Sequence, residues 1–97
     1  MNEPFEVRIG PAARRQLHRL PARVAFAIAE FVTVTLPENP LRLTKPLTGE
    51  FYGLRSARRG EYRVLVRVDL EARVLLVVRV AHRAELLSAE AYRPPPP

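Results

Sequence analysis

Four arginines lie close together in the stretch LRSARRGEYRVLV, residues 54–66, beside a run of residues that is typical of a β-strand. They are Arg55, Arg58, Arg59 and Arg63, and the first three crowd a short predicted loop. Guanidinium groups stay charged at physiological pH and bind phosphate through paired hydrogen bonds. They also stabilise the charge that develops on phosphorus during transesterification. The cluster therefore predicts a binding site for a polyanion, and RNA is the polymer that this chemistry suits.

A second group of candidate residues ends the next strand-like run, at "AHR", residues 81–83. Histidine is the side chain that exchanges a proton most readily near neutral pH, so His82 is a candidate for proton transfer. If the two runs pair as an antiparallel hairpin, the end of the second lies beside the start of the first. We therefore expect Arg63, His82 and Arg83 to meet at one edge of a sheet, with the three loop arginines close by.

Each of these candidates also has a purely structural interpretation. The two arginines before Gly60 are compatible with a solvated loop. Arg63 is compatible with an exposed strand residue that pairs with Glu61 or Asp69. A capping or surface role explains His82 as well as catalysis does.

The first part of the chain predicts one strand and two helices. Residues 5–9 alternate apolar and charged side chains, as a half-buried strand does. Pro11 is well placed to begin a helix and Pro21 to begin another, which Pro37 and Pro40 end. The two helices are expected to form an antiparallel hairpin. Their apolar faces consist of Ala13, Leu17 and Leu20 in the first helix and of Val24, Ile28, Phe31 and Thr35 in the second.

The second half of the chain predicts a β-hairpin after a loop at residues 38–53. In Tyr62–Asp69 the side chains alternate, with the valines on one face and Arg63 on the other. Residues 74–81 are apolar almost throughout, and their one charge, Arg79, is expected on the side of Leu75 and Val77. Residues 54–57 are a candidate for one more short strand. The order β-α-α-β-β-β predicts an α+β fold in which a small antiparallel sheet packs against an N-terminal helical hairpin.

Composition limits the functions that are open to this chain. Its 97 residues suffice for one domain, which we expect at residues 1–93, followed by a proline-rich tail at 94–97. A net charge of +6 favours nucleic acid or another acidic partner. The absence of Cys excludes disulfides and a thiolate nucleophile, and two His with one Asp make a metal site within this chain improbable. No cofactor is predicted. Neither a secretion signal nor a membrane segment is evident, so we expect a cytoplasmic protein.

Several short motifs, in order and at matching spacing, resemble the RelE family of bacterial toxins from toxin–antitoxin operons, within the RelE/ParE superfamily. The motifs are K-P-L-x-G from Lys45, L-R at 54–55, G-x-Y-R-V at 60–64 and H-R at 82–83. The N-terminal strand and the helix AARRQLHRLP match as well, so the resemblance extends to about Leu87. It implies a small antiparallel sheet against a helical hairpin.

The resemblance also implies an activity and partners. Active members cleave mRNA in the ribosomal A site without a metal, by attack of the 2′-hydroxyl on its own phosphodiester. An antitoxin wraps around the toxin and blocks it, and operator DNA is bound only through that complex. Carried over to this chain, Arg63 binds the scissile phosphate, Arg83 acts on the leaving group or the transition state, and Arg55 binds RNA. Arg58, Arg59 and Lys45 are further candidates for RNA binding.

The chain departs from the family pattern at three positions. Phe51 and Gly53 stand where well-studied members carry lysines, one of which is a base. Leu87 stands near the place of a tyrosine that stacks on the substrate base. The general base is therefore open, with His82 as the first candidate and Lys45 as the second.

Two other functions remain open at this stage. A ParE-like toxin has the same fold, inhibits DNA gyrase by binding and cleaves no RNA, so it needs no base. A basic binding module would act only with its antitoxin on operator DNA. Retention of Arg63 and of the H-R pair favours the nuclease.

Overall fold

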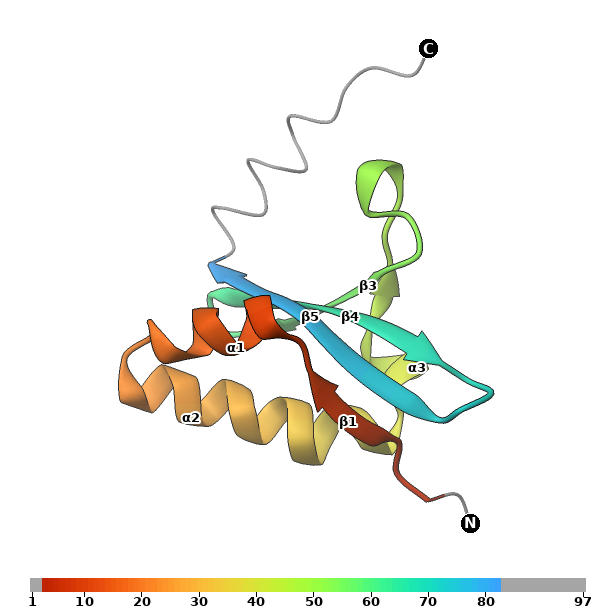
Figure 1. The fold of residues 1–97 in the computed structure, drawn as a ribbon, viewed down its shortest axis with the longest axis horizontal. Coiled ribbons are helices and arrows are strands. Elements are labelled where there is room, and N and C mark those ends of the chain that lie inside the picture. Colours follow the sequence, from red (N-terminus) through yellow and green to blue (C-terminus); the bar gives the residue numbers. More distant parts are fainter. Residues whose placement is uncertain (1–2, 83–97) are drawn as a thin grey trace.

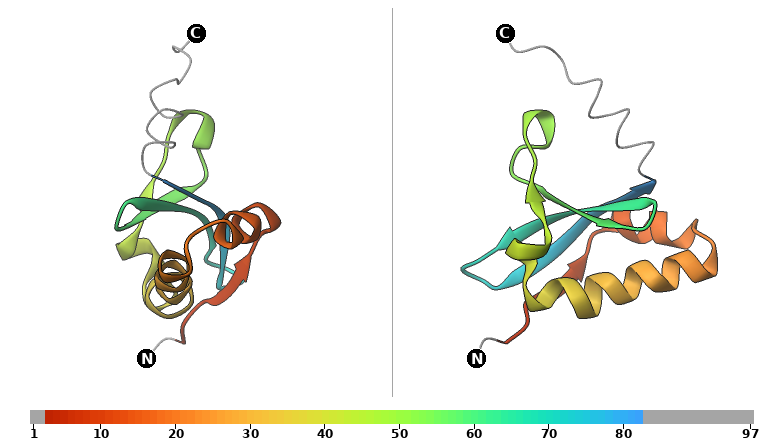
Figure 2. Two further views of the ribbon diagram at one scale, coloured as in Figure 1. Left: turned by 90° about the vertical axis from the view of Figure 1, so that its left-hand side faces the viewer. Right: turned by 180° about the vertical axis from the view of Figure 1, so that it is seen from behind.

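The computed structural model describes residues 3–82, which form a five-stranded sheet and its helices (Figure 1). Helices α1 (Pro11–His18) and α2 (Ala22–Glu30) lie together on one side of the sheet (Figure 2). The strands, in the spatial order β1-β5-β4-β3-β2, are β1 (Glu6–Ile9), β5 (Val74–His82), β4 (Tyr62–Asp69), β3 (Arg55–Arg59) and β2 (Lys45–Pro46). The predicted α+β fold with a helical hairpin is confirmed. Arg83 and residues 94–97 lie outside the described residues.

One edge of the sheet differs from the prediction. The pairs β2–β3, β3–β4 and β4–β5 are antiparallel, but β1 pairs with β5 in parallel. Backbone hydrogen bonds from Glu6 N–H to Arg73 O (2.9 Å) and from Gly10 N–H to Val77 O (2.8 Å) fix this edge. Parallel strands need a long connection between them, and the helices and the other strands supply it here. The alternation in β1 predicts a strand but carries no signal of its direction.

The main core lies between the helices and one face of the sheet. Valines 64 and 66 of β4 are fully buried there, as are Leu75 and Val77 of β5. Ala13 of α1 and Ile28 of α2 pack against them from the helices. Burying a side chain of this size contributes about 1.5–3 kcal/mol relative to an exposed one, so this face holds the fold together.

The end of the helical hairpin differs from the prediction because the helix changes pitch. After α2 comes a π-helical turn, Phe31–Thr35, and then a 3₁₀ turn, Leu36–Glu38. A π-turn bonds each N–H to the carbonyl five residues earlier, which shifts the buried face along the chain. Val32 and Leu36 are therefore buried, whereas Thr35, predicted to belong to the apolar face, is exposed.

The region predicted as a loop contains more structure than expected. A short helix α3 (Pro40–Leu43), strand β2 and a 3₁₀ turn at Gly49–Phe51 lie within it. The segment between β2 and β3 projects beyond the sheet, away from α2 (Figure 1). The short strand predicted at 54–57 is present as β3, which includes all three arginines that were expected in a loop.

No helix within residues 3–82 is both long and apolar enough to cross a membrane.

Candidate functional site

The pleat of the sheet separates arginines that are adjacent in the sequence. In the β3–β4 pair, Arg58 lies opposite Arg63, and Arg63 in turn lies opposite Ala81 of β5. Directly paired residues share a face, and these face away from the helices. Because side chains alternate along a strand, Arg55 and Arg59 belong to the other face. Of the three arginines expected beside Arg63, the structure therefore brings only Arg58 to its face.

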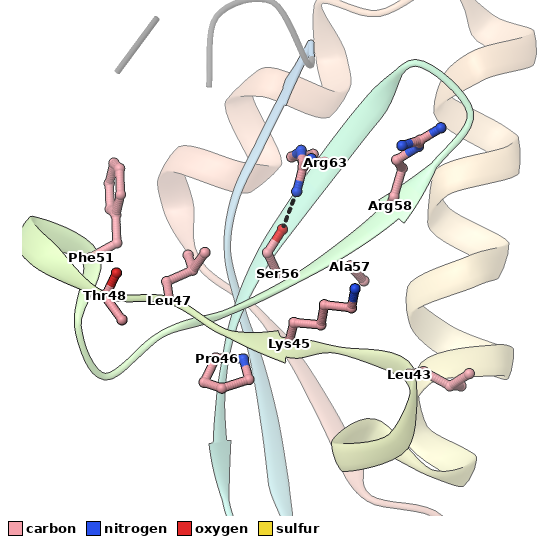
Figure 3. Close-up of a pocket in the computed structure, with 10 residues that line it drawn as sticks. All are labelled: Leu43, Lys45, Pro46, Leu47, Thr48, Phe51, Ser56, Ala57, Arg58 and Arg63. Atoms are coloured by element: carbon pink, nitrogen blue, oxygen red, sulfur yellow. Dashed lines mark hydrogen bonds between the residues drawn. The ribbon is translucent and has the colours of Figure 1, made fainter. Parts of the chain in front are cut away.

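A cleft of about 560 Å³ opens on this uncovered face (Figure 3). Lys45 from β2, Arg58 from β3 and Arg63 from β4 supply its cations. No carboxylate is among the described residues that line it. The other lining residues are Leu43, Pro46, Leu47, Thr48, Phe51, Ser56 and Ala57. Among the residues that the structure describes, the lining of this cleft therefore carries three positive charges and no negative one.

The side chain of Arg63 lines the cleft and is held by a hydrogen bond to β3. Its Nη1 donates a hydrogen bond of 3.4 Å to Oγ of Ser56, which is buried (Figure 3). Its Nε is buried and has no hydrogen-bond partner among residues 3–82. Within residues 3–82 no salt bridge joins Arg63 to Asp69. Like charges directly opposite one another in a sheet destabilise it, and Arg58 lies in that position. The pairing of Arg58 with Arg63 therefore costs stability in the free protein, and a bound anion would offset that cost.

Arg55, predicted to bind RNA, is engaged in supporting the fold. Its Nε donates to Thr44 Oγ1 at 2.7 Å, and its Nη2 donates to the backbone oxygens of Thr44 (3.1 Å) and Leu41 (3.2 Å). Thr44 is buried and donates in turn to Pro40 O at 2.6 Å. Arg55 thus ties α3 to β3 just before the chain enters β2 and presents Lys45 to the cleft.

Arg59 also lies apart from the cleft. It borders a shallow apolar hollow formed with Val24 and Ile28 of α2 and with Tyr62. This hollow is on the helix side of the sheet, so the guanidinium group of Arg59 cannot share a ligand with Arg63. The prediction that Arg55 and Arg59 cluster with Arg63 is wrong, because it treated a strand as a loop.

His82 shares an end of the sheet with Arg63 but not a face. Its strand partner is Tyr62, and the two rings meet edge to face with their centroids 5.3 Å apart. A second hollow on this side is lined by Gln16 of α1, by Arg19 just after that helix and by His82. The expected meeting of Arg63 and His82 is therefore wrong, since the residue opposite Arg63 is Ala81.

Arg79 is a functional candidate that the sequence pattern misplaced. It was expected on the side of Leu75 and Val77, but it pairs with Leu65 on the uncovered face. A β-bulge in β5 causes the change, because Val66 pairs with Val77 while Leu65 pairs with Arg79. Strict alternation cannot reveal such a bulge, and no other signal in the sequence marks it.

A small apolar cluster supports the uncovered face beside the cations. Leu65 and Ala81 are buried at its centre, and Leu47, Phe51 and Leu54 pack against them from the projecting segment. Within residues 3–82 no group of three or more His, Cys, Asp or Glu could hold a metal ion. The polar groups that line the described cleft are two guanidinium groups, the lysine amine and the hydroxyl groups of Thr48 and Ser56.

Comparison with known proteins identifies relatives over most of the chain. Residues 7–87 match the family described as the ParE toxin of type II toxin–antitoxin systems, parDE. Toxin RelG of Mycobacterium tuberculosis (strain ATCC 25618 / H37Rv) is 47% identical over 83 residues, which cover 86% of this chain and 95% of RelG. Toxin RelE of the same organism is 40% identical over 93 residues, which cover 96% of both chains.

Solved structures show the same fold. A chain of the toxin–antitoxin complex RelBE2 from Mycobacterium tuberculosis superposes with a TM-score of 0.81 at 46% identity, over 87% of this chain and 97% of that one. A mutant of Escherichia coli toxin RelE in the free state superposes with a TM-score of 0.70 at 17% identity, over 94% and 95% of the two chains.

Proposed function

Because the chain belongs to the RelE/ParE superfamily of type II toxin–antitoxin toxins, we propose that it is a ribosome-dependent endonuclease that cleaves mRNA in the ribosomal A site. Such cleavage inhibits translation in the cytoplasm. The observation that supports this proposal is the cleft on the uncovered face, which Arg63, Arg58 and Lys45 line and to which residues 3–82 contribute no carboxylate. A negatively charged RNA backbone fits that surface.

In this proposal Arg63 binds the scissile phosphate. The 2′-hydroxyl gives its proton to a base as its oxygen attacks phosphorus, the bond from phosphorus to the 5′-oxygen breaks, and that oxygen takes up a proton, so that a 2′,3′-cyclic phosphate and a 5′-hydroxyl result. Negative charge on the equatorial oxygens grows during attack, and the fixed guanidinium of Arg63 stabilises it. Ser56 limits the movement of that group by accepting its hydrogen bond. Arg83, by the family resemblance, acts on the leaving group. No metal takes part.

Lys45 is the residue that we assign to proton transfer. Of the described cleft residues, its amine exchanges a proton far more readily than the arginines, which remain protonated. His82, the first candidate from the sequence, lies on the other face of the sheet. The test compares Lys45→Arg with Lys45→Gln. Loss of cleavage in both variants supports proton transfer, whereas full activity of Lys45→Arg reduces Lys45 to a phosphate-binding charge.

A cognate antitoxin is the protein partner of this proposal. Phe26 and Val34 on the outer side of the helical segment are 62% and 60% exposed, and a shallow hollow of about 260 Å³ lies between Arg23, Phe26 and Glu30. An amphipathic, acidic antitoxin segment would cover this apolar surface and offset the net charge of +6. Operator DNA would be bound only through the toxin–antitoxin complex. Saturating antitoxin should raise the melting temperature, and an unchanged value would contradict this partner.

A second function, inhibition of DNA gyrase, is favoured by one observation. The family whose profile matches residues 7–87 is described as the ParE toxin. Gyrase inhibition by binding would need no residue for proton transfer. The names of the two relatives and the cationic cleft support the nuclease instead.

Primer extension during translation in vitro separates the two functions. The wild type and Arg63→Ala are added to an mRNA with and without ribosomes. Cuts that require ribosomes and disappear in Arg63→Ala support the nuclease. Growth arrest in cells without any such cut, together with loss of gyrase supercoiling in vitro, would replace it with the second function.

A further inference from the structure

Strand β5 carries a β-bulge that redirects one arginine. From Val74 to Val77 the strand follows its pairing with β4 in strict register, and Val78 is then the extra residue. After it, Arg79 pairs with Leu65 and Ala81 with Arg63. Without the bulge Arg79 would face the packed helices. Bulges near functional sites commonly re-aim a side chain in this way.

Helix α1 and the residue before it hold the bulge in place from both sides. The backbone N–H of Val80 donates to Oε1 of Gln16 at 2.7 Å, so a side chain provides the acceptor for this group. On the other side of the bulge, Gly10 N–H donates to Val77 O at 2.8 Å. A Cβ at position 10 would lie 3.2 Å from that same oxygen, which favours glycine there. Specific contacts on both sides of Val78 therefore stabilise the bulge.

Arg79 occupies an unfavourable environment for the free protein. Its Nε is buried and has no hydrogen-bond partner, and within residues 3–82 no ion pair neutralises its charge. It is a diagonal neighbour of Arg63, the other arginine with a buried and unpartnered Nε. Diagonal Cβ atoms on one face of a sheet are about 7–8 Å apart, which brings two like charges close together. An anionic ligand at the outer nitrogens of the two guanidinium groups would relieve the charge repulsion.

We propose that Arg79 is a phosphate-binding residue that holds the RNA backbone one phosphate away from the one bound by Arg63. The inference rests on the RNA-binding part of the proposed function. The diagonal placement of the two stems suits two phosphates of one strand better than two oxygens of a single phosphate. Arg79 binds a group that does not react, so it contributes equally before and during the chemical step. Loss of Arg79 should therefore raise KM and leave kcat unchanged.

The first experiment measures KM and kcat for mRNA cleavage on ribosomes with the wild type, Arg79→Gln and Arg67→Gln. Arg67 is the matched control. It is an exposed arginine of β4 that lies on the uncovered face, as Arg79 does, but nearer the turn between β4 and β5. We expect Arg79→Gln to raise KM about tenfold, as loss of a charged hydrogen bond does, and to leave kcat unchanged. Arg67→Gln should raise KM much less. Arg79→Lys keeps the charge and should recover part of the loss.

The second experiment measures binding to a fully 2′-O-methylated RNA oligonucleotide, whose nucleophile is blocked, over a range of salt concentrations. Loss of one phosphate contact should reduce the slope of log K against log[salt] by about 0.7 for single-stranded RNA. We expect this reduction for Arg79→Gln and not for Arg67→Gln. Melting temperatures of both variants confirm that they are folded, and Arg79→Met, which also removes the charge, replaces Arg79→Gln if the latter is not.

The outcomes separate this inference from the function on which it rests. A wild type that binds the oligonucleotide but cuts no mRNA would refute the nuclease, while the salt slopes would still decide the role of Arg79. A wild type that cuts mRNA, with Arg79→Gln and Arg67→Gln behaving alike, would overturn the inference alone. A loss confined to kcat would also overturn it, since Arg79 would then act on the chemical step. A wild type that neither binds nor cuts would overturn both.

Discussion

The two faces of the sheet use similar residues for different purposes. On the covered face, Leu75 and Val77 are sealed beneath α1 and α2, and Arg55 at the margin is satisfied by three hydrogen bonds. On the uncovered face, Arg63 and Arg79 each have a buried Nε that finds no hydrogen-bond partner within residues 3–82. One face is arranged for stability, and the other keeps cations whose needs the described fold does not meet.

The difference shows that charges adjacent in a sequence need not act together. Strand β3 places Arg58 on one face and its neighbours Arg55 and Arg59 on the other. The cleft instead draws its cations from three different strands: Lys45 from β2, Arg58 from β3 and Arg63 from β4. The pairing of strands, rather than the local density of arginine in the sequence, therefore determines which cations lie together.

The largest expected effect comes from replacing one arginine on each face of the sheet and comparing the two variants. Arg63→Gln should reduce mRNA cleavage on the order of 100-fold or more, because a fixed donor to the developing charge is lost. Arg59→Gln removes the same charge from the other side of the sheet and should leave cleavage near the wild-type rate. Primer extension with both variants measures the contrast. Equal losses would mean that total charge, and not the face, determines activity.

The free energy of unfolding should depend more on a leucine of the covered face than on one of the uncovered face. Leu75→Ala opens a cavity in the main core and should lower the free energy of unfolding by about 3–4 kcal/mol. Leu65→Ala, in the small cluster of the uncovered face, should cost only about 2 kcal/mol, because the projecting segment can collapse onto the gap or admit water. Urea denaturation of the two variants measures the difference. A larger loss for Leu65→Ala would show that the uncovered face also stabilises the fold.

How much the sequence could predict follows the same division between the faces. Periodicity predicted the helical hairpin, strands β4 and β5 and the covered core, because burial of apolar side chains there follows regular spacing. The motifs around Lys45, Arg63 and His82 predicted the superfamily, and the comparisons confirm it. Sequence periodicity therefore predicts those parts of the fold that the packing of apolar side chains determines.

The predictions failed where the spacing is irregular. The π-helical turn moved Leu36 into the core in place of Thr35, and the bulge at Val78 moved Arg79 across the sheet. Both depend on contacts with distant elements, such as the one between Gln16 and Val80, which a local pattern does not contain. The sequence also predicted that His82 meets Arg63 at one edge of the sheet, but the pairing of His82 with Tyr62 and of Arg63 with Ala81 places them on opposite faces.

A smaller effect should separate the two arginines of β3. Arg55→Met removes three hydrogen bonds, two of them to backbone oxygens, and should destabilise the fold by about 1–3 kcal/mol without weakening RNA binding. Arg58→Met removes an exposed side chain and should leave stability nearly unchanged while weakening RNA binding. Urea denaturation and titration with a 2′-O-methylated RNA oligonucleotide measure both properties. Weaker RNA binding by a stable Arg55→Met would restore Arg55 to the binding surface.

The smallest effect has the opposite sign and concerns Arg79. Arg79→Met replaces a buried, unpartnered Nε with an apolar side chain of similar length beside Leu65 and removes the repulsion from Arg63. The free energy of unfolding should therefore rise by about 1 kcal/mol, while KM for mRNA rises as well. Arg67→Met is the control and should change stability by less than about 0.5 kcal/mol, as exposed substitutions do. If Arg79→Met unfolds more easily than the wild type, Arg79 stabilises the free protein, and the two faces would not differ in purpose.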